Sequence, residues 1–358
     1  MILGGLFCGG EFSQVGEELS RPNGLDFDFQ LPGLSAQLAR LIAQIPTGRV
    51  TTYGDLADAL GLRTAARWVG EFMREHEHTP ECVCHRVVRK DGDLGLYLRE
   101  RTPAEKAARL QSEDVDVTDG VVEDFAEIVF RRFQSKKPLA RLIEIQHELA
   151  ERVYLEPLAA LPPIVAGLDV SYGADGAAVG ACAIVETETG HLVWSATHRV
   201  AAPLPYIPSL LTFRELPALL SLANEARQQF PDLKLFLVDG NGILHPRGAG
   251  IATCFGVVLG VPTIGVAKSQ LCGKVENELP LIEGCLPMSV EGKVVGAVFQ
   301  RSRQAHRLYI SPGQRIDLAG SLRAVKRLDF GHRLPEPLYW ADRLSRVEAK
   351  RVNNHSPL

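Results

Sequence analysis

The sequence predicts an α/β protein of two domains, in which a small helix-turn-helix domain precedes a larger domain built on a helix-covered sheet. The chain has 358 residues, 46% of them apolar, which exceeds what one ordinary core requires and is enough for two. Two short helices around a glycine turn, and an alternation of strands and helices from residue 164 onward, indicate these two kinds of domain. We place a poorly ordered arm at 1–30, the first domain at 31–120 and the second at 121–358.

The composition indicates a cytoplasmic protein that does not enter a membrane. No run of eighteen or more apolar residues occurs, and residues 1–8 lack the basic flank of a signal peptide. The seven cysteines are scattered through apolar runs, unlike a disulfide framework. Because the net charge is −4, DNA would have to be held by local basic patches. Residues 130–141 and 300–315 carry basic residues and no acid, although a solvated surface explains each of them equally well.

In the first domain, apolar residues at helical spacing predict a helix over 34–45 that Pro46 ends. Residues 50–73 predict two further short helices. Thr52 is placed to cap the first of them, Gly61 to follow its end, and Thr64 to open the second. Two helices around such a turn form a helix-turn-helix candidate, a motif whose second helix reads the major groove of DNA.

In the second domain, alternating apolar residues and β-branched side chains predict strands, and longer periodic runs predict helices. After an acidic stretch at 113–124, helix resumes at residue 125. The predicted strands are 164–170, 179–185, 192–200, 234–238, 263–266, 294–299 and 307–310, and the predicted helices are 212–229, 249–259 and 318–327. The first three strands are consecutive and predict a meander.

Cys84 is the candidate nucleophile of the first domain. A cysteine reacts as its thiolate, which a base or positive neighbours favour. His85 is such a base, and Arg86, Arg89 and Lys90 carry the positive charges. Taken alone, a Cys-His pair is more often a buried and inert cysteine.

A zinc site is the rival chemistry at this place. Its ligands would come from His76, His78, Cys82, Cys84 and His85. The sequence disfavours zinc, because structural sites usually have two to four residues between paired cysteines and a second ligand pair further along the chain.

Residues 34–113 resemble the DNA-binding and active-site domain of O6-alkylguanine-DNA alkyltransferases. The segments IPTGRVTTYGDLADALG, AARWVG and CHRVVRKDGDLGLY, followed by the region of Glu113, occur in that family's order. The resemblance implies a winged helix-turn-helix fold in which Cys84 accepts the alkyl group of a flipped base, once per molecule. It also implies that His85 relays the thiol proton through water and that Glu113 orients His85. The implied DNA contacts are Tyr53 at the nucleotide backbone, Arg67 in the place of the flipped base, Arg86 and Tyr97.

Departures from the alkyltransferase pattern put the range of lesions in question. His76-Glu77 stands in place of Asn-Pro, Val83 in place of a proline, and Leu98 in place of a serine that contacts the base. The alternative reading is a domain that binds alkylated DNA without transfer, as alkyltransferase-like proteins do. Those relatives replace the cysteine, so the retained Cys84 favours transfer.

Acidic residues recur in the second domain at strand ends. Asp169 and Asp239 each end a predicted buried strand, Glu215 opens a helix, and Asp342 lies within the segment EPLYWADRLS. A carboxylate in such a place is costly to bury unless it pairs or binds a cation. Several converging carboxylates would bind Mg²⁺, which steadies an attacking water and the leaving oxygen of a phosphodiester. A plain turn explains Asp239 equally well, because Gly240 follows it.

Residues from about 125 to 346 resemble endonuclease V. The segments PYIPSLLTFRE, VDGNGILHPRGAGIAT, GVPTIGVAKSQLCGK, LYISPGQRI and RLPEPLYWADR occur in that family's order and spacing. The resemblance implies an RNase H-like fold with Mg²⁺ as cofactor and Mn²⁺ as its substitute. The implied metal ligands are Asp169, Glu215 and Asp239, with Asp342 nearby and with His245 and Lys268 at the scissile phosphate. The loop Pro205, Tyr206, Ile207 and Pro208 would act as a wedge in the gap left by a displaced base.

The endonuclease V resemblance implies cleavage of DNA one nucleotide beyond deoxyinosine on its 3′ side. Leu216, Asn241 and Gln314 depart from common family residues, but no departure removes a carboxylate. Four glycines, 240, 242, 248 and 250, fit a backbone that closely approaches nucleic acid. We therefore expect a monomeric repair protein with two activities, acting on single- or double-stranded DNA that carries O6-alkylguanine or deoxyinosine. Inosine-containing RNA is the alternative nuclease substrate.

Overall fold

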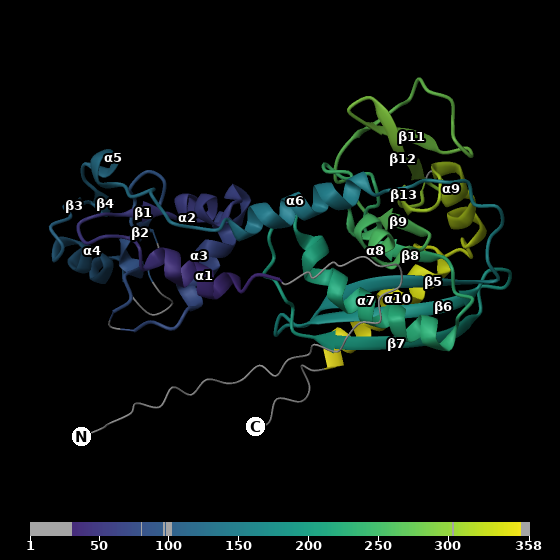
Figure 1. Cartoon of the computed structure of the whole chain (residues 1–358), viewed down its shortest axis with the longest axis horizontal. Helices are drawn as coiled ribbons and strands as arrows, with labels where there is room; N and C mark the ends of the chain where they lie inside the picture. The colour runs from purple at the N-terminus through teal and green to yellow at the C-terminus, as the bar shows by residue number, and fades with distance from the viewer. Residues whose placement is uncertain (1–30, 80, 96, 98–101, 303, 352–358) are drawn as a thin grey trace.

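The computed structural model describes residues 31–79, 81–95, 97, 102–302 and 304–351. The arm 1–30 and Leu98, on which two expectations depend, lie outside the described residues. Within them the chain forms two domains of the predicted kinds, joined through helix α6 (Pro138–Glu151) (Figure 1). No helix in this part of the chain is both long and apolar enough to cross a membrane.

The first domain contains the predicted helix-turn-helix. Helix α1 (Leu34–Ile42) packs on α2 (Tyr53–Leu60), and the 3₁₀ turn η1 (Arg63–Ala65) leads into α3 (Ala66–Glu75). Thr52 caps α2 by accepting a hydrogen bond from the Asp55 amide, as predicted. Gly61 ends α2 at φ +98°, and a Cβ at this position would lie 2.7 Å from the Ala140 amide nitrogen of α6. Glycine is therefore required there by both backbone angle and space.

Short strands complete the first domain around the candidate nucleophile. β1 (Thr51–Thr52) pairs in parallel with β2 (Val87–Val88), directly after the 3₁₀ turn η2 (Cys84–Arg86). The remaining elements are α4 (Pro103–Gln111), the hairpin β3 (Val117–Thr118) and β4 (Val121–Val122), and α5 (Phe125–Ile128). Val122, Phe125 and Ile128 pack with Val50 and Val88. The sequence placed the boundary between the two domains at residue 120. In the structure, the residues that follow still pack on the first domain.

The second domain is a mixed nine-stranded sheet between helical layers (Figure 1). Its strands lie in the order β10-β11-β12-β13-β9-β8-β5-β6-β7. They span β5 (Ile164–Tyr172), β6 (Ala178–Glu186), β7 (Leu192–Val200), β8 (Phe236–Asp239), β9 (Thr263–Ala267), β10 (Lys274–Val275), β11 (Leu286–Val290), β12 (Lys293–Phe299) and β13 (Leu308–Gln314). β5, β6 and β7 form the predicted antiparallel meander, whereas β5, β8 and β9 run parallel to one another.

Alternating side chains divide the core between the two faces of this sheet. Ala166 and Leu168 of β5 pack toward α7 (Leu211–Gln229) and α8 (Ile251–Leu259). Val165 belongs instead to the cluster of α9 (Leu318–Arg327) and α10 (Glu336–Arg351). A Cβ at Gly167 would lie 2.3 Å from the Pro337 carbonyl, so α10 rests directly on β5. This close packing brings Asp342 of α10 toward the ends of the strands.

An apolar cluster joins the two domains. Leu139 and Leu142 of α6 pack with the helices of the first domain, and Leu204, Ile207 and Leu210 of the second domain belong to the same cluster. At the other end of α6, Gln146 is buried and donates to the Ala249 carbonyl at 3.0 Å. One helix therefore contacts both domains.

Candidate active sites

Cys84 lies at the start of η2 with only 1% of its surface exposed. The parallel pairing of β1 with β2 brings this turn beside the helix-turn-helix, because Thr52, the cap of α2, pairs with Val88. Tyr53 is half-buried at the start of α2, and Arg67 is exposed on α3, where it pairs with Glu71 at 3.3 Å. A nucleophile and a helix that could enter a DNA groove thus share one small domain.

Glu113 binds His85 as the sequence comparison implied. The His85 Nε2 atom lies 2.7 Å from Glu113 Oε1, and His85 is buried. Burial lowers the pKa of His85, so the ring is neutral at pH 7. His85 Nδ1 is buried with no hydrogen-bond partner among the described residues. That nitrogen is therefore available to take a proton.

Arg86 does not lie where a DNA contact requires it. Its side chain is buried and donates to Glu113 at 2.7 and 2.8 Å, to the Ile45 carbonyl at 2.6 Å and to Thr47 at 3.1 Å. Although partial burial opposes it, the hydrogen bonds from Arg86 and His85 hold the pKa of Glu113 below its ordinary value. Because Glu113 needs a cationic partner in this interior, Arg86 fixes the carboxylate rather than a phosphate.

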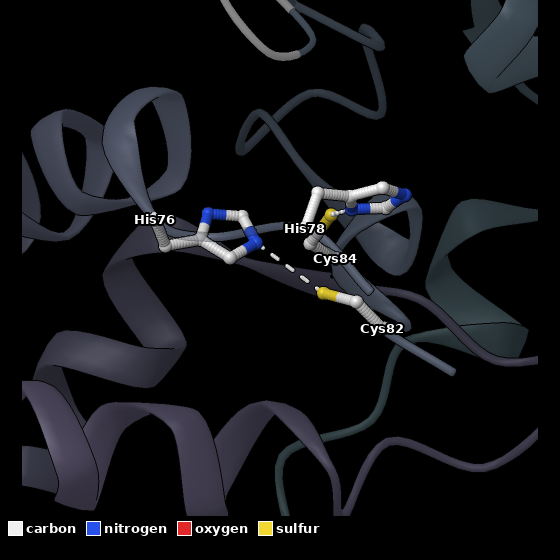
Figure 2. A group of neighbouring side chains, drawn as sticks. All are labelled: His76, His78, Cys82 and Cys84. Atoms are coloured by element: carbon white, nitrogen blue, oxygen red, sulfur yellow. Dashed lines mark hydrogen bonds between the residues drawn. The ribbon is translucent and has the colours of Figure 1, made fainter. Parts of the chain in front are cut away.

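The environment of the Cys84 sulfur differs from the sequence expectation. Its hydrogen-bond partner is His78 Nδ1 at 3.4 Å, and Cys82 Sγ lies 3.3 Å from His76 Nε2 (Figure 2). Hydrogen bonding with Cys84, and then with His76, lowers the pKa of Cys82. The same bond to Cys82, together with burial, raises the pKa of Cys84. Cys82 is therefore the more acidic thiol in the absence of any other ligand.

Lys106 and Tyr97 are buried side chains on the interior side of the Cys84 site. Lys106 is 1% exposed and donates to the carbonyls of Val87 and Leu94, each at 2.5 Å. Burial lowers the pKa of Lys106 to about 8 and raises that of Tyr97 to about 12. The sequence did not identify Lys106, because a lysine on an amphipathic helix predicts a solvated face. Tyr97 is 3% exposed, so it lines the interior beside Cys84 rather than the outer surface.

The second site gathers three aspartates from distant segments. β5 and β8 are parallel neighbours, so Asp169 and Asp239 lie side by side, and α10 adds Asp342. One carboxylate oxygen from each of the three lies within 4.8 Å of the others. Burial, then the neighbouring Asp239, raises the pKa of Asp169 to about 7. These crowded carboxylates fit a divalent cation, which would displace the proton and offset the repulsion between their negative charges.

Lys268 stands at the centre of this acidic cluster. It follows β9 and donates hydrogen bonds to Asp239 and, at 2.5 Å, to Asp342, while Asp169 lies 4.0 Å away. Ser345 donates to Asp169 at 2.5 Å. Arg346 also pairs with Asp342, at 2.9 Å, so two cations face three carboxylates. The remaining negative charge supports cation binding.

Glu215 is not part of the three-carboxylate group, although the sequence comparison implied it as a ligand. It is 8% exposed on α7 and accepts a hydrogen bond from the Tyr172 hydroxyl at 3.0 Å. Burial raises the pKa of Glu215 to about 7. It nevertheless lines the same cavity of about 480 Å³ as Asp169, Asp239 and Lys268. Asp342, expected only as a nearby acid, completes the closest group instead.

His245 and Tyr206 line this cavity as well. Burial, then Arg247, lowers the pKa of His245 to about 4, so its imidazole is neutral. Its Nδ1 accepts a hydrogen bond from the Arg247 amide at 3.2 Å. The ring proton therefore resides on Nε2, which can donate to a phosphate oxygen.

The predicted wedge loop divides into exposed and buried parts. Tyr206 is 56% exposed, and Pro205 and Pro208 flank it. Ile207 is only 1% exposed and belongs to the cluster that joins the domains. Leu204 and Leu210 are buried in the same cluster as Ile207. Ile207 therefore anchors the loop in the protein core instead of facing DNA.

Comparisons with known proteins match both parts of the chain. Residues 147–343 match the family described as Endonuclease V, and residues 34–115 match that of the 6-O-methylguanine DNA methyltransferase DNA-binding domain. Proteins described as bifunctional methyltransferase/endonuclease from Thermoplasma volcanium and Picrophilus torridus are 33% and 34% identical. Their alignments cover 92% and 90% of this chain and 95% and 98% of the relatives.

Solved structures resemble the second domain. The catalytic domain of human endonuclease V is 28% identical, with a TM-score of 0.56, over 62% of this chain and 100% of that one. Ciona intestinalis endonuclease V, solved with a 23mer DNA containing an inosine followed by a ribo-adenosine, is 27% identical with a TM-score of 0.54. That alignment covers 61% of this chain and 100% of the Ciona chain.

Proposed function

The chain belongs to the family of bifunctional methyltransferase/endonucleases, and we propose that it repairs O6-alkylguanine by transfer to Cys84 and cuts DNA 3′ to deoxyinosine with Mg²⁺. The grouping of Asp169, Asp239 and Asp342 is the observation that carries the nuclease assignment, and Asp169 and Asp239 line one cavity with Lys268 and His245. The buried His85–Glu113 pair beside Cys84 supports transfer. The six described cysteines are free, which suits a reducing cytoplasm.

In the proposed transfer, the Cys84 sulfur attacks the alkyl carbon and the bond from that carbon to guanine O6 breaks. His85 Nδ1 takes the thiol proton through water, and Glu113 holds the resulting cation at 2.7 Å from Nε2. The product thioether has no return path, so one molecule repairs one lesion. Because the sulfur is 1% exposed, the base must leave the duplex to reach it.

In the proposed cleavage, Asp169, Asp239 and Asp342 would hold Mg²⁺, which stabilises the attacking water and the leaving oxygen when bound. Lys268 then neutralises negative charge at the reacting phosphate. The neutral His245 donates from Nε2 to a phosphate oxygen. Glu215 lines the same cavity, and in this proposal it orients water.

The decisive experiment compares both reactions on the same protein preparation. We expect cleavage of an inosine duplex with Mg²⁺ and none after chelation, with the cut one nucleotide beyond the inosine. A matched RNA strand tests the alternative substrate, and cleavage of RNA alone would refute the DNA assignment. Separately, incubation with O6-methylguanine DNA should add one methyl mass to the peptide containing Cys84. If the peptide gains no mass, the first domain binds alkylated DNA without transferring the alkyl group.

Tyr206 provides a test of the proposed wedge. Its exposed ring lines the acidic cavity, so it can stack against the bases around a displaced inosine. We expect Tyr206→Ala to weaken binding of inosine DNA by about 1–3 kcal/mol, roughly 5- to 150-fold, as loss of one stacking contact does. Binding is measured by fluorescence anisotropy with Ca²⁺ in place of Mg²⁺.

Tyr154→Ala is the matched control for Tyr206→Ala, because Tyr154 is similarly exposed, at 59%, and does not line the cavity. Its affinity for inosine DNA should be unchanged. Equal affinity of the Tyr206→Ala and parent proteins would show that the ring is not a wedge.

A further inference from the structure

Two imidazoles and one further thiol surround the Cys84 sulfur, and these three side chains have no part in the proposed alkyl transfer. His76 follows the end of α3, His78 lies in the loop after it, and Cys82 and Cys84 lead into η2 (Figure 2). One ligand atom from each of the four lies within 4.8 Å of the others. Three of the residues are half-buried and Cys84 is buried. The sequence disfavoured a metal here on spacing, yet the loop brings these four residues together.

The separations between ligand atoms fit a tetrahedral metal site. Zinc binds sulfur at about 2.3 Å and nitrogen at about 2.0–2.1 Å, which places neighbouring ligand atoms roughly 3.3–3.8 Å apart. The His76 Nε2 to Cys82 Sγ distance is 3.3 Å, and the His78 Nδ1 to Cys84 Sγ distance is 3.4 Å. The remaining pairs lie within 4.8 Å of one another, so they would contract by no more than about 1.5 Å to complete the tetrahedron.

The hydrogen bonds outside this group support metal binding by His76. Its Nδ1 lies 3.2 Å from the Phe72 carbonyl, which can only accept, so the ring proton is on Nδ1. The Nε2 lone pair therefore points toward the cluster. Metal-bound histidines usually donate their second nitrogen to a carbonyl or carboxylate in this way.

His78 requires one local adjustment. Arg109 Nη1 lies 3.4 Å from both His78 Nε2 and the Cys82 carbonyl. Binding of a metal through Nδ1 places the ring proton on Nε2. Arg109 then keeps its contact with the carbonyl and gives up the one with His78.

We propose that His76, His78, Cys82 and Cys84 bind one Zn²⁺ ion, so that the alkyl acceptor is itself a metal ligand. Two thiolates and two imidazoles match the preference of zinc, whereas Mg²⁺ prefers the oxygen ligands of the aspartate cluster. Cysteine binds zinc as its thiolate. The metal thereby holds Cys84 in its nucleophilic form, a role that rests on the proposed alkyl transfer. The thiol proton then leaves when the metal binds, so His85 takes it at that stage and not during the attack.

Transfer to a zinc-bound Cys84 changes the metal site. The Cys84 sulfur forms a bond to the alkyl carbon, and the electron pair of the broken carbon–oxygen bond stays on guanine O6. The released guanine takes a proton from water. The resulting thioether is neutral and a weaker ligand than a thiolate, so repair of a lesion loosens the metal.

The test uses the full chain with Asp169→Ala and Asp239→Ala, which removes the second cation site, and it includes a phosphine reductant. We expect one zinc per chain by elemental analysis, and Co²⁺ should produce thiolate-to-cobalt charge-transfer absorption. Cys82→Ser, Cys84→Ser and His76→Ala should each weaken binding by more than the roughly 10- to 100-fold that follows loss of an outer partner. Cys272→Ser and His147→Gln, which alter residues outside the group, should leave binding unchanged. Absence of charge-transfer absorption in the parent would overturn the site. Absorption of undiminished intensity in Cys84→Ser at the same Co²⁺ concentration would do so as well, because that variant keeps only one of the two thiolates.

A second measurement leaves Cys84 unmutated. Adding O6-methylguanine DNA to the cobalt-loaded chain should reduce the charge-transfer absorption mole for mole with methyl found on Cys84. Complete methylation without any spectral change would refute Cys84 as a ligand. If the absorption is present but no methyl is transferred, the metal site stands and the transfer assignment fails.

Discussion

Replacing Asp239 with alanine is expected to lower Mg²⁺-dependent cleavage of inosine DNA by at least about 10³-fold. A catalytic cation supplies several kcal/mol of transition-state stabilisation, and each 1.4 kcal/mol corresponds to a factor of about ten in rate. Asp239 is one of three carboxylates in the closest group, and it also holds Lys268. Because Lys268 keeps Asp342 as an ion-pair partner, we expect the variant to fold and the lower rate to reflect the lost metal ligand. The rate is measured under single-turnover conditions.

Asp232→Ala is the matched control, because this aspartate is exposed in the turn before β8 and outside the acidic group. Its cleavage rate should equal that of the parent. Methyl transfer to Cys84 should be intact in both variants. Loss of transfer in Asp239→Ala would show that the two sites do not act independently.

Replacing Cys84 with serine is expected to abolish alkyl transfer completely. A buried serine hydroxyl is not ionised at neutral pH, so the attack on the alkyl carbon loses its nucleophile. Mass spectrometry after exposure to O6-methylguanine DNA should show no methyl on any peptide of Cys84→Ser. Cleavage of inosine DNA should be unchanged, because the aspartate cluster lies in the other domain.

Cys272→Ser is the control for that experiment, since Cys272 is a free, half-buried thiol outside the site. It should still be methylated at Cys84. The result that would contradict the assignment is methylation of Cys82 in the Cys84→Ser variant. That outcome has a physical basis, because Cys82 is the more acidic thiol of the pair.

Local signals in the sequence predicted much of the fold. The Thr52 side chain caps the start of α2, the left-handed backbone of Gly61 ends it, and α9 spans the predicted residues 318–327. Alternating apolar residues likewise located the strands of the meander. These predictions succeed because caps, glycine turns and periodicity act between residues a few positions apart.

Packing between distant segments escaped the sequence analysis. The last helix, α10, was not predicted, so its placement of Asp342 beside Asp169 and Asp239 was unknown. Gly242 illustrates the same limit. A Cβ there would lie 2.0 Å from the Pro312 carbonyl oxygen, so the position is closed by the protein's own backbone rather than by nucleic acid. Ile207 and Arg86 were likewise assigned to DNA because their burial depends on contacts far away in sequence.

The length of helix α6 sets how the two domains, and with them the two active sites, are oriented relative to each other. Leu139 and Leu142 face one domain, and Gln146 is fixed to the other at Ala249. Each residue of an α-helix advances the chain by 1.5 Å and turns it by about 100°. A flexible tether would tolerate lengthening, but one inserted amino acid between these anchors would swing one domain around the other by over a quarter of a circle. The number of residues between the two anchors is therefore constrained.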